Sequence, residues 1–349
     1  MKIFVAMSSG VDSSVCLFTL KQQGHDVTGI TLRLDDNYDN PIIKSKLLCK
    51  KLGIQHIVLD YRNEFKKEII NIFNNHVLKG ITPVPCVMCN RKIKLGKLVK
   101  FCKDNNAKLA TGHYAKIVLE NKNGNKEYCI HKAADKLKDQ THFLCGIEKN
   151  VLQDILFPLG NTLKSEVFRI AKENDLMAIN SYKESQEVCF FENKTYAEYV
   201  KSLNFEEEFN GDILHIKTKK KIGTHRGLLK YTIGQRQGLG IAWKEPLYVV
   251  NKDCKNNILY VGEEKYLYNK QLRIKNINIL SNDIENVKTF DCQVCLRDKT
   301  PIIDATINIE NKSTDRANVF LKKPARAITP GQICAFYKKD KLLGGGEIM

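Results

Sequence analysis

The chain has 349 residues, of which 43% are hydrophobic and 27% charged, and this balance indicates a folded globular protein and excludes wholesale disorder. Its 56 Lys and Arg residues against 39 Asp and Glu give a net charge of +17, which favours a polyanionic partner such as nucleic acid, although a proteome rich in Lys, Asn and Ile would give the same charge. No apolar run reaches the ~18 residues of a membrane-spanning helix and MKIFVAM is not a signal peptide, so we expect a cytoplasmic protein without a membrane partner.

Residues 1–112 alternate between predicted strands and helices. Short apolar runs, typical of strands buried on both faces, occur at 3–7, 27–34, 54–59 and 108–111. Helical spacing of apolar residues predicts helices from 11 to Gly24, around 47–52, from 63 to 78 and from 91 to 103. This order predicts an α/β fold in which a doubly wound parallel sheet binds its ligands at the carboxyl ends of the strands.

The rest of the chain is divided by its composition and its pattern of apolar residues. Residues 114–132 are typical of a hairpin that turns at 123–125, and apolar spacing predicts a helix over 163–171. After residue 203 an acidic run and a glycine turn resemble a linker, and short alternating strands follow. We therefore predict a catalytic domain at 1–203, a small central domain at 204–268 and a C-terminal β-barrel at 269–349.

A serine-rich loop, Ser8 to Ser14, joins the first predicted strand to the first helix. The backbone N–H groups of such a loop and the helix N-terminus form an anion site, and Asp12 could hold a magnesium ion. The loop lacks the Walker pattern and resembles the SGGxDSS pyrophosphate loop of ATP pyrophosphatases, which cleave ATP between the α- and β-phosphates. Ser9 stands where that family has glycine, so a positive φ at Ser9 would be strained.

Two of the twelve cysteines, Cys86 and Cys89, lie in the segment Thr82 to Asn90 and precede Arg91 and Lys92. A cysteine at a helix N-terminus beside basic residues has a lowered pKa and is nucleophilic, and we favour this interpretation over a buried pair of thiols. Cys292 and Cys295 also have metal-ligand spacing. Residues three apart in a strand point to opposite faces, however, so we interpret that pair as structural.

Three further segments contain candidate site residues. His113 follows Gly112 at the end of a predicted strand, where ligands bind, and we favour a functional role for it. The residues Lys138 to Gln140 are by themselves an ordinary polar turn. Cys189 lies between Val188 and two phenylalanines, and read alone it is more typical of a core residue than of a nucleophile.

The motifs together are more specific than any one of them. The loop at 8–14, PCVMCN, ATGHY, KDQTHFL, EVCF, GLLKYTIGQRQGLGI, TPGQ and LGGGEI occur in this order along the whole chain. The chain is thereby similar to the bacterial tRNA-specific 2-thiouridylases, which place sulfur on the wobble uridine. The resemblance implies ATP and Mg²⁺ as cofactors. It places ATP on Ala6, Met7, Ser8, Ser9, Gly10, Val11, Asp12, Ser13, Leu32 and Gly112.

The resemblance also implies roles for two cysteines. Cys189 would carry a persulfide delivered by a sulfur-relay protein or a cysteine desulfurase. Cys89 would be the second catalytic cysteine, which releases sulfide or forms a disulfide with Cys189. Nucleophiles that are far apart in sequence commonly meet in the fold.

The tRNA contacts of the family map onto five parts of this chain. A wobble base is inexpensive to flip out of a single-stranded anticodon loop, and the family substrates are the Lys, Glu and Gln tRNAs. Asp298 follows Arg297, where the family usually has a tyrosine, and an acid at this position would repel phosphate. The implied contact residues are Val84, Pro85, Cys86, His113, Lys138, Asp139, Gln140, Arg297, Asp298 and Gln332.

Cys86 is a second departure, because many members have aspartate there. With Cys89 and Cys189 it could hold a 4Fe–4S cluster that carries sulfur in place of a persulfide, and we favour the persulfide. Two other readings stay open. One is a different ATP pyrophosphatase that adenylates a small substrate, and the other is a metal- or cluster-binding RNA-binding protein without turnover.

Overall fold

The computed structural model describes residues 1–349 except 123, 177–187, 192–193, 204–209 and 312–314. The acidic run at 206–208, which we interpret as part of a linker, lies outside the described residues.

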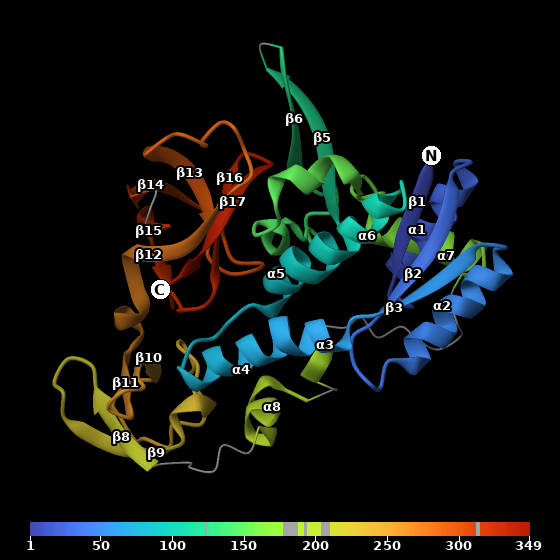
Figure 1. Cartoon of the computed structure of the whole chain (residues 1–349). Helices are drawn as coiled ribbons and strands as arrows, with labels where there is room; N and C mark the ends of the chain where they lie inside the picture. Colours follow the sequence, from blue (N-terminus) through green and yellow to red (C-terminus); the bar gives the residue numbers. More distant parts are fainter. Residues whose placement is uncertain (123, 177–187, 192–193, 204–209, 312–314) are drawn as a thin grey trace.

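A parallel sheet in the order β3–β2–β1–β4–β7 organises the first part of the chain (Figure 1). Side chains of the central strand β1 alternate between its faces, with Ile3 and Val5 packed in a cluster with residues of α1 and α2, and Phe4 in the cluster on the other face. Both faces are covered, which confirms the predicted doubly wound sheet. The strands are β1 (Lys2–Met7), β2 (Asp26–Arg33), β3 (Gln55–Asp60), β4 (Lys108–Ala110) and β7 (Ile155–Leu156).

Helices on one face lie close to the predicted positions. Helix α1 (Val11–Gln22) follows β1, α2 (Asp39–Lys51) follows β2, and α7 (Lys164–Glu173) packs against α1. The smaller helical elements are η3 (Thr141–Leu144), η4 (Lys149–Asp154), η5 (Cys189–Phe191), α8 (Tyr196–Ser202), η6 (Leu228–Lys230) and η7 (Glu264–Leu267).

Two long helices on the other face each contain a π-helical segment. The first runs through α3 (Arg62–Phe65), η1 (Lys66–Ile70) and α4 (Asn71–Leu78). The second runs through α5 (Pro85–Cys89), η2 (Asn90–Lys97) and α6 (Leu98–Asp104). It therefore begins at Pro85, in the first helical position where proline is favoured, and not at Arg91 as the apolar spacing predicts.

The C-terminal strands form a closed antiparallel barrel, because β12 pairs with both β15 and β17. The predicted barrel is thereby confirmed. Its order is β12–β15–β14–β13–β16–β17, and the core includes Val294, Ile307, Val319 and Phe336. The strands are β12 (Tyr268–Ile279), β13 (Thr289–Cys295), β14 (Ile303–Asn311), β15 (Arg316–Arg326), β16 (Ile333–Lys338) and β17 (Lys341–Ile348).

The hairpin predicted near 114–132 is present as β5 (Ala115–Lys122) and β6 (Asn125–Lys132). Figure 1 shows it projecting from the body of the molecule. Its base joins the barrel sheet, since Leu342 of β17 pairs with Ile130 of β6. The sequence gives no sign of this pairing between residues more than 200 positions apart.

One buried lysine of the barrel strand β17 contacts two acids of the hairpin. Lys341 Nζ lies 2.9 Å from Glu120 Oε2, 3.4 Å from Glu127 Oε2 and 3.3 Å from Asp283 Oδ2. Only 7% of the Lys341 side chain is exposed. We call these four residues the junction cluster.

A smaller sheet in the order β10–β11–β8–β9 is formed by residues that lie between the two larger parts in the sequence. Ile213, Val249, Leu259 and Val261 form its core. The division of the chain at 203 and 268 stays a prediction. The strands are β8 (Asn210–His215), β9 (Lys221–Arg226), β10 (Leu247–Asp253) and β11 (Ile258–Glu263).

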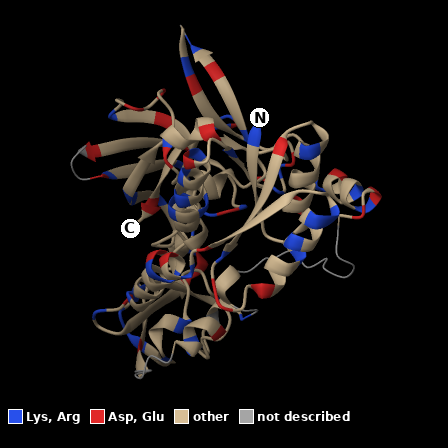
Figure 2. Ribbon diagram, turned by 45° about the vertical axis from the view of Figure 1, so that its right-hand side comes forward, with Lys and Arg blue, Asp and Glu red and all other residues tan. Residues whose placement is uncertain are grey.

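The surface charge is spread over the whole molecule. Figure 2 shows Lys and Arg on the helices and on both β-rich parts, with Asp and Glu interspersed. Among the helices that the structure describes, none combines the length and the apolar character needed to cross a membrane.

Candidate active site

The serine-rich loop has the geometry of an anion site. It leads from β1 into α1, and Ser13 Oγ lies 3.3 Å from the backbone nitrogen of Ser8, which donates to it. The hydroxyls of Ser13 and Ser14 both donate to the carbonyl oxygen of Gly10, at 2.9 and 3.0 Å. Ser9 has a φ of 60°, so the conformation that glycine adopts without cost is here imposed on a serine.

Asp12 is held by two residues that the sequence does not single out for this site. Lys164 Nζ lies 2.7 and 2.8 Å from the two carboxylate oxygens of Asp12, and the hydroxyl of Tyr114 donates to Oδ1 at 2.7 Å. The Lys164 side chain is only 9% exposed. Because both oxygens of Asp12 are already engaged by a cation, the residues present do not fit a magnesium ion on this carboxylate. Lys164 lies far along the chain from the loop, and no local pattern marks it.

The ATP residues predicted beyond the loop lie at the same edge of the sheet. Leu32 is at the carboxyl end of β2 and Gly112 follows β4. A side chain at Gly112 would place its Cβ 3.1 Å from Asp12 Cβ and 3.2 Å from the backbone nitrogen of Ser13. The absence of a side chain at Gly112 therefore allows the β4 loop to approach the serine-rich loop closely.

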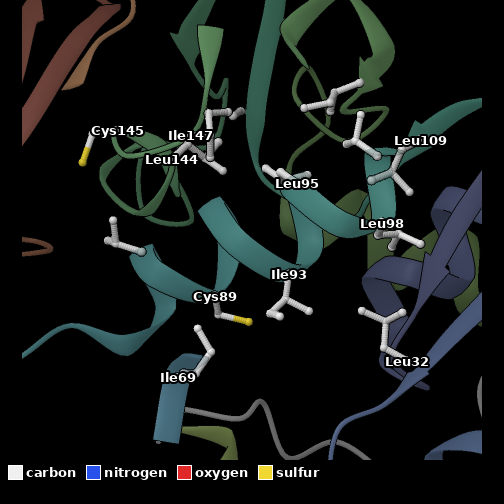
Figure 3. Close-up of a cluster of buried hydrophobic side chains, with 14 of the residues drawn as sticks. Leu32, Ile69, Cys89, Ile93, Leu95, Leu98, Leu109, Leu144, Cys145 and Ile147 are labelled. Atoms are coloured by element: carbon white, nitrogen blue, oxygen red, sulfur yellow. The ribbon is translucent and has the colours of Figure 1, made fainter. Parts of the chain in front are cut away.

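The three candidate thiols come from two elements. Cys86 and Cys89 lie in α5, and Cys189 begins η5. Cys86 and Cys189 are exposed, whereas Cys89 is 6% exposed. In Figure 3, Cys89 and Ile93 project from one side of the helix toward Ile69. All twelve cysteines are free thiols.

The prediction of a lowered pKa for Cys89 is wrong. Burial raises the pKa of the Cys89 thiol to about 11, and the opposing charge that acts on it most is Lys94 rather than Arg91 or Lys92. The reason is that the helix begins at Pro85, so Cys89 lies inside a continuous helix and packs in the core. The pKa of Cys86 and that of Cys189 are also raised, because the surrounding protein removes part of their hydration although each side chain reaches solvent, and Lys94 opposes this shift.

Cys189 is not the core residue that its neighbours alone suggest. Phe190 and Phe191 are buried and pack against Phe73 and Tyr199, with the Phe191 and Tyr199 rings stacked at 4.5 Å. These rings anchor η5 and leave the thiol of Cys189 exposed. Ser185 to Glu187, the first residues of that motif, lie outside the described residues.

Two residues near the thiols were not predicted as site residues. Lys94 acts electrostatically on all three thiols, on Tyr38 and on His113. Tyr38 is half-buried and precedes α2. Burial is the main cause that raises the pKa of its phenol, and Cys189 is among the neighbours that raise it further. The side of the helix on which Lys94 lies depends on the π-helical segment, and the sequence does not mark that segment.

His113 is oriented by its own strand end. Its Nδ1 lies 2.7 Å from the Thr111 hydroxyl, and its ring meets Phe157 edge-on. Burial, with a smaller effect of Lys94, lowers the pKa of His113 to about 3, so the imidazole is neutral at physiological pH.

The predicted tRNA contacts from the first domain gather beside His113. Gln140 exchanges hydrogen bonds with the backbone of Tyr114, at 2.9 and 3.0 Å. Asp139 accepts from the backbone of Ala133 at 2.8 Å and from the Thr141 hydroxyl at 2.6 Å. Val84 and Pro85 lie at the start of α5, and Lys138 lies in the turn before η3.

The barrel contributes the remaining predicted contacts. Gln332 donates to the carbonyl oxygen of Thr82 at 2.8 Å, which ties the barrel to the segment that enters α5. Asp298 acts electrostatically on Cys86, and its own pKa is raised by burial and by Asp139. Arg297 is exposed next to it. The structure thus brings Cys86 together with an acid from the barrel.

The thiols do not form a site for a single metal ion. Among the described residues, the only group of three or more candidate ligands with atoms within 4.8 Å of one another is Glu120, Glu127 and Cys129. The ammonium of Lys341 already contacts both carboxylates of that group. A cubane cluster holds its cysteine sulfurs farther apart than a single ion does, and the donor set Cys86, Cys89 and Cys189 has the chemistry that such a cluster takes.

Three family models match successive parts of the chain. They are described as a tRNA methyl transferase HUP domain over residues 1–193, a tRNA methyl transferase PRC-barrel domain over 199–263 and an aminomethyltransferase beta-barrel domain over 269–348.

Full-length relatives are similar to the chain from end to end. The tRNA-specific 2-thiouridylase MnmA of Rickettsia felis is 38% identical and covers 99% of this chain and 96% of its own length. That of Rickettsia typhi is 39% identical and covers 99% and 98%. Among solved structures, the U34-tRNA thiolase NcsA from Methanococcus maripaludis with its 4Fe–4S cluster aligns with 58% of this chain and 65% of that chain at 18% identity, with a TM-score of 0.36, a likeness too weak to bear on function.

Proposed function

Because the chain belongs to the tRNA-specific 2-thiouridylase family, we propose that it is an ATP-dependent sulfurtransferase that replaces O2 of a tRNA uridine by sulfur. The observation that carries this proposal is the convergence of Cys86, Cys89 and Cys189 on Lys94 beside the ligand edge of the parallel sheet. An enzyme that only adenylates a small molecule needs no such set of thiols.

The first step makes a leaving group of the uridine oxygen. ATP lies on Ala6 to Ser13, with Leu32 and Gly112 at its other end. The uridine O2 attacks the α-phosphorus, a new O–P bond forms, and the bond to the β-phosphate breaks to release pyrophosphate. The backbone N–H groups of the loop and the N-terminus of α1 bind the phosphates. Lys164 holds Asp12 in place.

The second step transfers sulfur from Cys189. The terminal sulfur of a Cys189 persulfide attacks C2 of the adenylated uridine. The Cys89 thiolate then attacks the Cys189 sulfur and forms a disulfide, the S–S bond to the transferred sulfur breaks, and AMP leaves from C2. The transferred sulfur is reduced while two thiols are oxidised, so electrons balance. The exposure of Cys189 suits its loading by a partner protein.

An alternative sulfur carrier is a 4Fe–4S cluster held by Cys86, Cys89 and Cys189. The observation that favours it is the exposed third thiol, Cys86. Such a cluster, when bound, supplies a sulfide at its open iron, and a persulfide on Cys189 is then not required.

We place the substrate uridine at the wobble position, in the Lys, Glu and Gln tRNAs of the cytoplasm. Its recognition falls to Val84 to Cys86, His113 and Lys138 to Gln140 of the domain 1–203, and to Arg297, Asp298 and Gln332 of the barrel 269–349. The domain 204–268 links the two. A sulfur-relay protein or a cysteine desulfurase supplies the sulfur.

The test separates adenylation from sulfur transfer. Anaerobically purified protein is incubated with ATP and an unmodified tRNA that bears a wobble uridine, and pyrophosphate, AMP and 2-thiouridine are measured. We expect release of pyrophosphate only with the uridine present. The Cys189→Ala variant should retain adenylation and lose at least ~10³-fold in 2-thiouridine formation, because its nucleophile is gone.

Two results would contradict the proposal. Pyrophosphate release that is unchanged when the wobble uridine is replaced by cytidine would indicate a small-molecule adenylating enzyme. A complete lack of ATP cleavage, together with bound iron, would indicate a cluster-binding protein without turnover. Iron content and the Cys86→Asp variant, which leaves the persulfide route intact, distinguish the two sulfur carriers.

A further inference from the structure

Lys94 is a cation without an acidic partner at the centre of the candidate site. Its side chain is exposed, and no residue that the structure describes forms an ion pair with it. The groups on which it acts come from separate parts of the chain: Tyr38 before α2, Cys86 and Cys89 in α5, His113 after β4 and Cys189 in η5. Desolvation opposes the charge of Lys94, but these thiols and the phenol raise its pKa overall, so it is an ammonium ion.

The π-helical segment aims this lysine. Hydrogen bonds in a π-helix join residues five apart, so Cys89 and Lys94 lie one above the other, whereas residues five apart in an α-helix are separated by ~140°. Gly96 permits this turn, because a Cβ there would lie 2.5 Å from the carbonyl oxygen of Arg91, five residues earlier. The register of the helix thus places an unpaired positive charge on the side of the helix that carries Cys89.

An unpaired cation among reacting groups needs an anion, and the proposed reaction supplies one. After adenylation the phosphate of AMP is bonded to the uridine O2 and carries one negative charge. When sulfur has attacked C2, the C2–O bond breaks and AMP leaves with a second negative charge on the same phosphate. An ammonium beside the thiols stabilises this charge as it develops, which lowers the barrier of sulfur transfer more than it strengthens substrate binding.

We propose that Lys94 is a catalytic residue that binds the phosphate joining AMP to the uridine and stabilises AMP as a leaving group. The inference rests on the proposed function, since it needs an adenylated uridine at the thiol site. It is independent of the sulfur carrier, because AMP leaves in the same way from a persulfide and from a cluster sulfide.

Lys92 provides the matched control. It lies in the same π-helical segment and is half-buried, and its charge is not among those that act most on the three thiols. A loss of net positive charge, or damage to the segment, would affect Lys92→Met and Lys94→Met alike. Loss of a contact with the reacting phosphate would affect only the second.

The experiment is a single turnover of the full chain with ATP, uridine-bearing tRNA and a cysteine desulfurase with free cysteine, which delivers sulfur at the oxidation level of a persulfide. Pyrophosphate release and 2-thiouridine formation are followed separately in the wild type, Lys94→Met, Lys94→Arg and Lys92→Met. We expect Lys94→Met to slow 2-thiouridine formation about 100-fold or more, as the loss of one transition-state donor does, with pyrophosphate release slowed less. Lys94→Arg should stay within about 10-fold of the wild type, and Lys92→Met within about 2-fold.

Rescue separates a catalytic role from a structural one. Because Lys94 is exposed, methylammonium added to Lys94→Ala should restore part of the rate without changing the thermal midpoint or the affinity for tRNA. Equal rates of 2-thiouridine formation in Lys94→Met and the wild type would overturn the inference, as would equal losses in Lys94→Met and Lys92→Met. If the wild type itself shows no uridine-dependent pyrophosphate release, the proposed function fails first.

Discussion

Lys94 and Lys341 represent opposite uses of a lysine in one chain. Lys341 is 7% exposed and has three carboxylates within 3.4 Å of its ammonium, whereas Lys94 is exposed and has no acidic partner among the described residues. The first is a buried charge that is fully compensated, and it joins the hairpin β5–β6 to the barrel. The second is a charge kept available. A compensated charge holds a structure together, and an uncompensated one is ready for a ligand.

The same contrast extends to the surroundings of each lysine. Near the candidate site, His142 is 3% exposed and neither of its ring nitrogens has a hydrogen-bond partner among the residues that the structure describes. Ser9 has a positive φ, and Asp298 is an acid in the predicted tRNA contact. The junction cluster shows no such conflicts. Local rules are broken where chemistry is expected and kept where parts of the fold are joined.

The largest expected effect breaks the junction cluster. Replacing Lys341 by Met removes the one cation that contacts all three acids. Glu127 keeps Lys149 and Asp283 keeps Lys122, but the buried carboxylates lose their shared partner, so we expect a loss of about 3–5 kcal/mol in the free energy of unfolding. Urea unfolding measures this loss. Lys338→Met, at the exposed end of β16, should change stability by less than about 0.5 kcal/mol, and so should Lys94→Met. Equal losses in the Lys94 and Lys341 variants would remove the distinction between the two lysines.

The next effect tests whether the buried imidazole of His142 destabilises the protein near the candidate site. Replacing His142 by Phe removes a buried imidazole that lacks hydrogen bonds, and we expect a gain of about 1–3 kcal/mol at pH 7. Urea unfolding of both proteins at pH 7 measures it. A loss of stability would show that the imidazole has a partner that outweighs its burial.

The pH dependence of the same residue gives a second test. Burial lowers the pKa of His142 to about 4, against 6.5 when unfolded, so the unfolded chain binds the extra proton between these values. The free energy of unfolding is therefore unaffected by this titration above pH 6.5. It falls as the pH drops toward 4 and levels off below that, with a total loss of about 3 kcal/mol. His142→Phe should show a correspondingly weaker fall in stability from pH 6.5 to pH 4.

The smallest effect concerns the strained serine of the ATP loop. Ser9→Gly relieves a φ of 60° but gives the unfolded chain more freedom, so we expect a net gain of only about 0.5–1 kcal/mol. Thermal unfolding without ATP detects it. Ser9→Ala keeps the side-chain carbon and should show no gain; a gain from alanine equal to that from glycine would assign the effect to the hydroxyl group instead.

The elements that follow from local periodicity could be predicted from the sequence. The apolar runs of β1 and β2, the helix after the serine-rich loop and the hairpin all have short-range patterns, and the structure contains them. The sequence places the start of the second long helix at residue 91, six residues after its true start at Pro85. Pro83 and Pro85 suggest an extended chain, but proline is also favoured in the first turn of a helix.

Most of the site depends on contacts that no local pattern encodes. Lys164 reaches Asp12 across 152 positions of sequence, and the burial of Cys89 depends on the helices that pack around it. The effect of Lys94 depends on one extra residue per turn in a short π-helical segment. The charged neighbours of Cys89 suggest a reactive thiol, but desolvation outweighs them, and desolvation is a property of the packed fold.

The position of β17 has a consequence for synthesis of the protein. This strand, the last in sequence order, closes the barrel against β12 and also pairs with β6, which a ribosome makes some 200 residues earlier. Until residues 341–348 have left the exit tunnel, β12, β16 and β6 each present an unpaired edge to the cell. The nascent chain therefore spends much of its elongation with open strand edges, a period in which chaperones have most to protect.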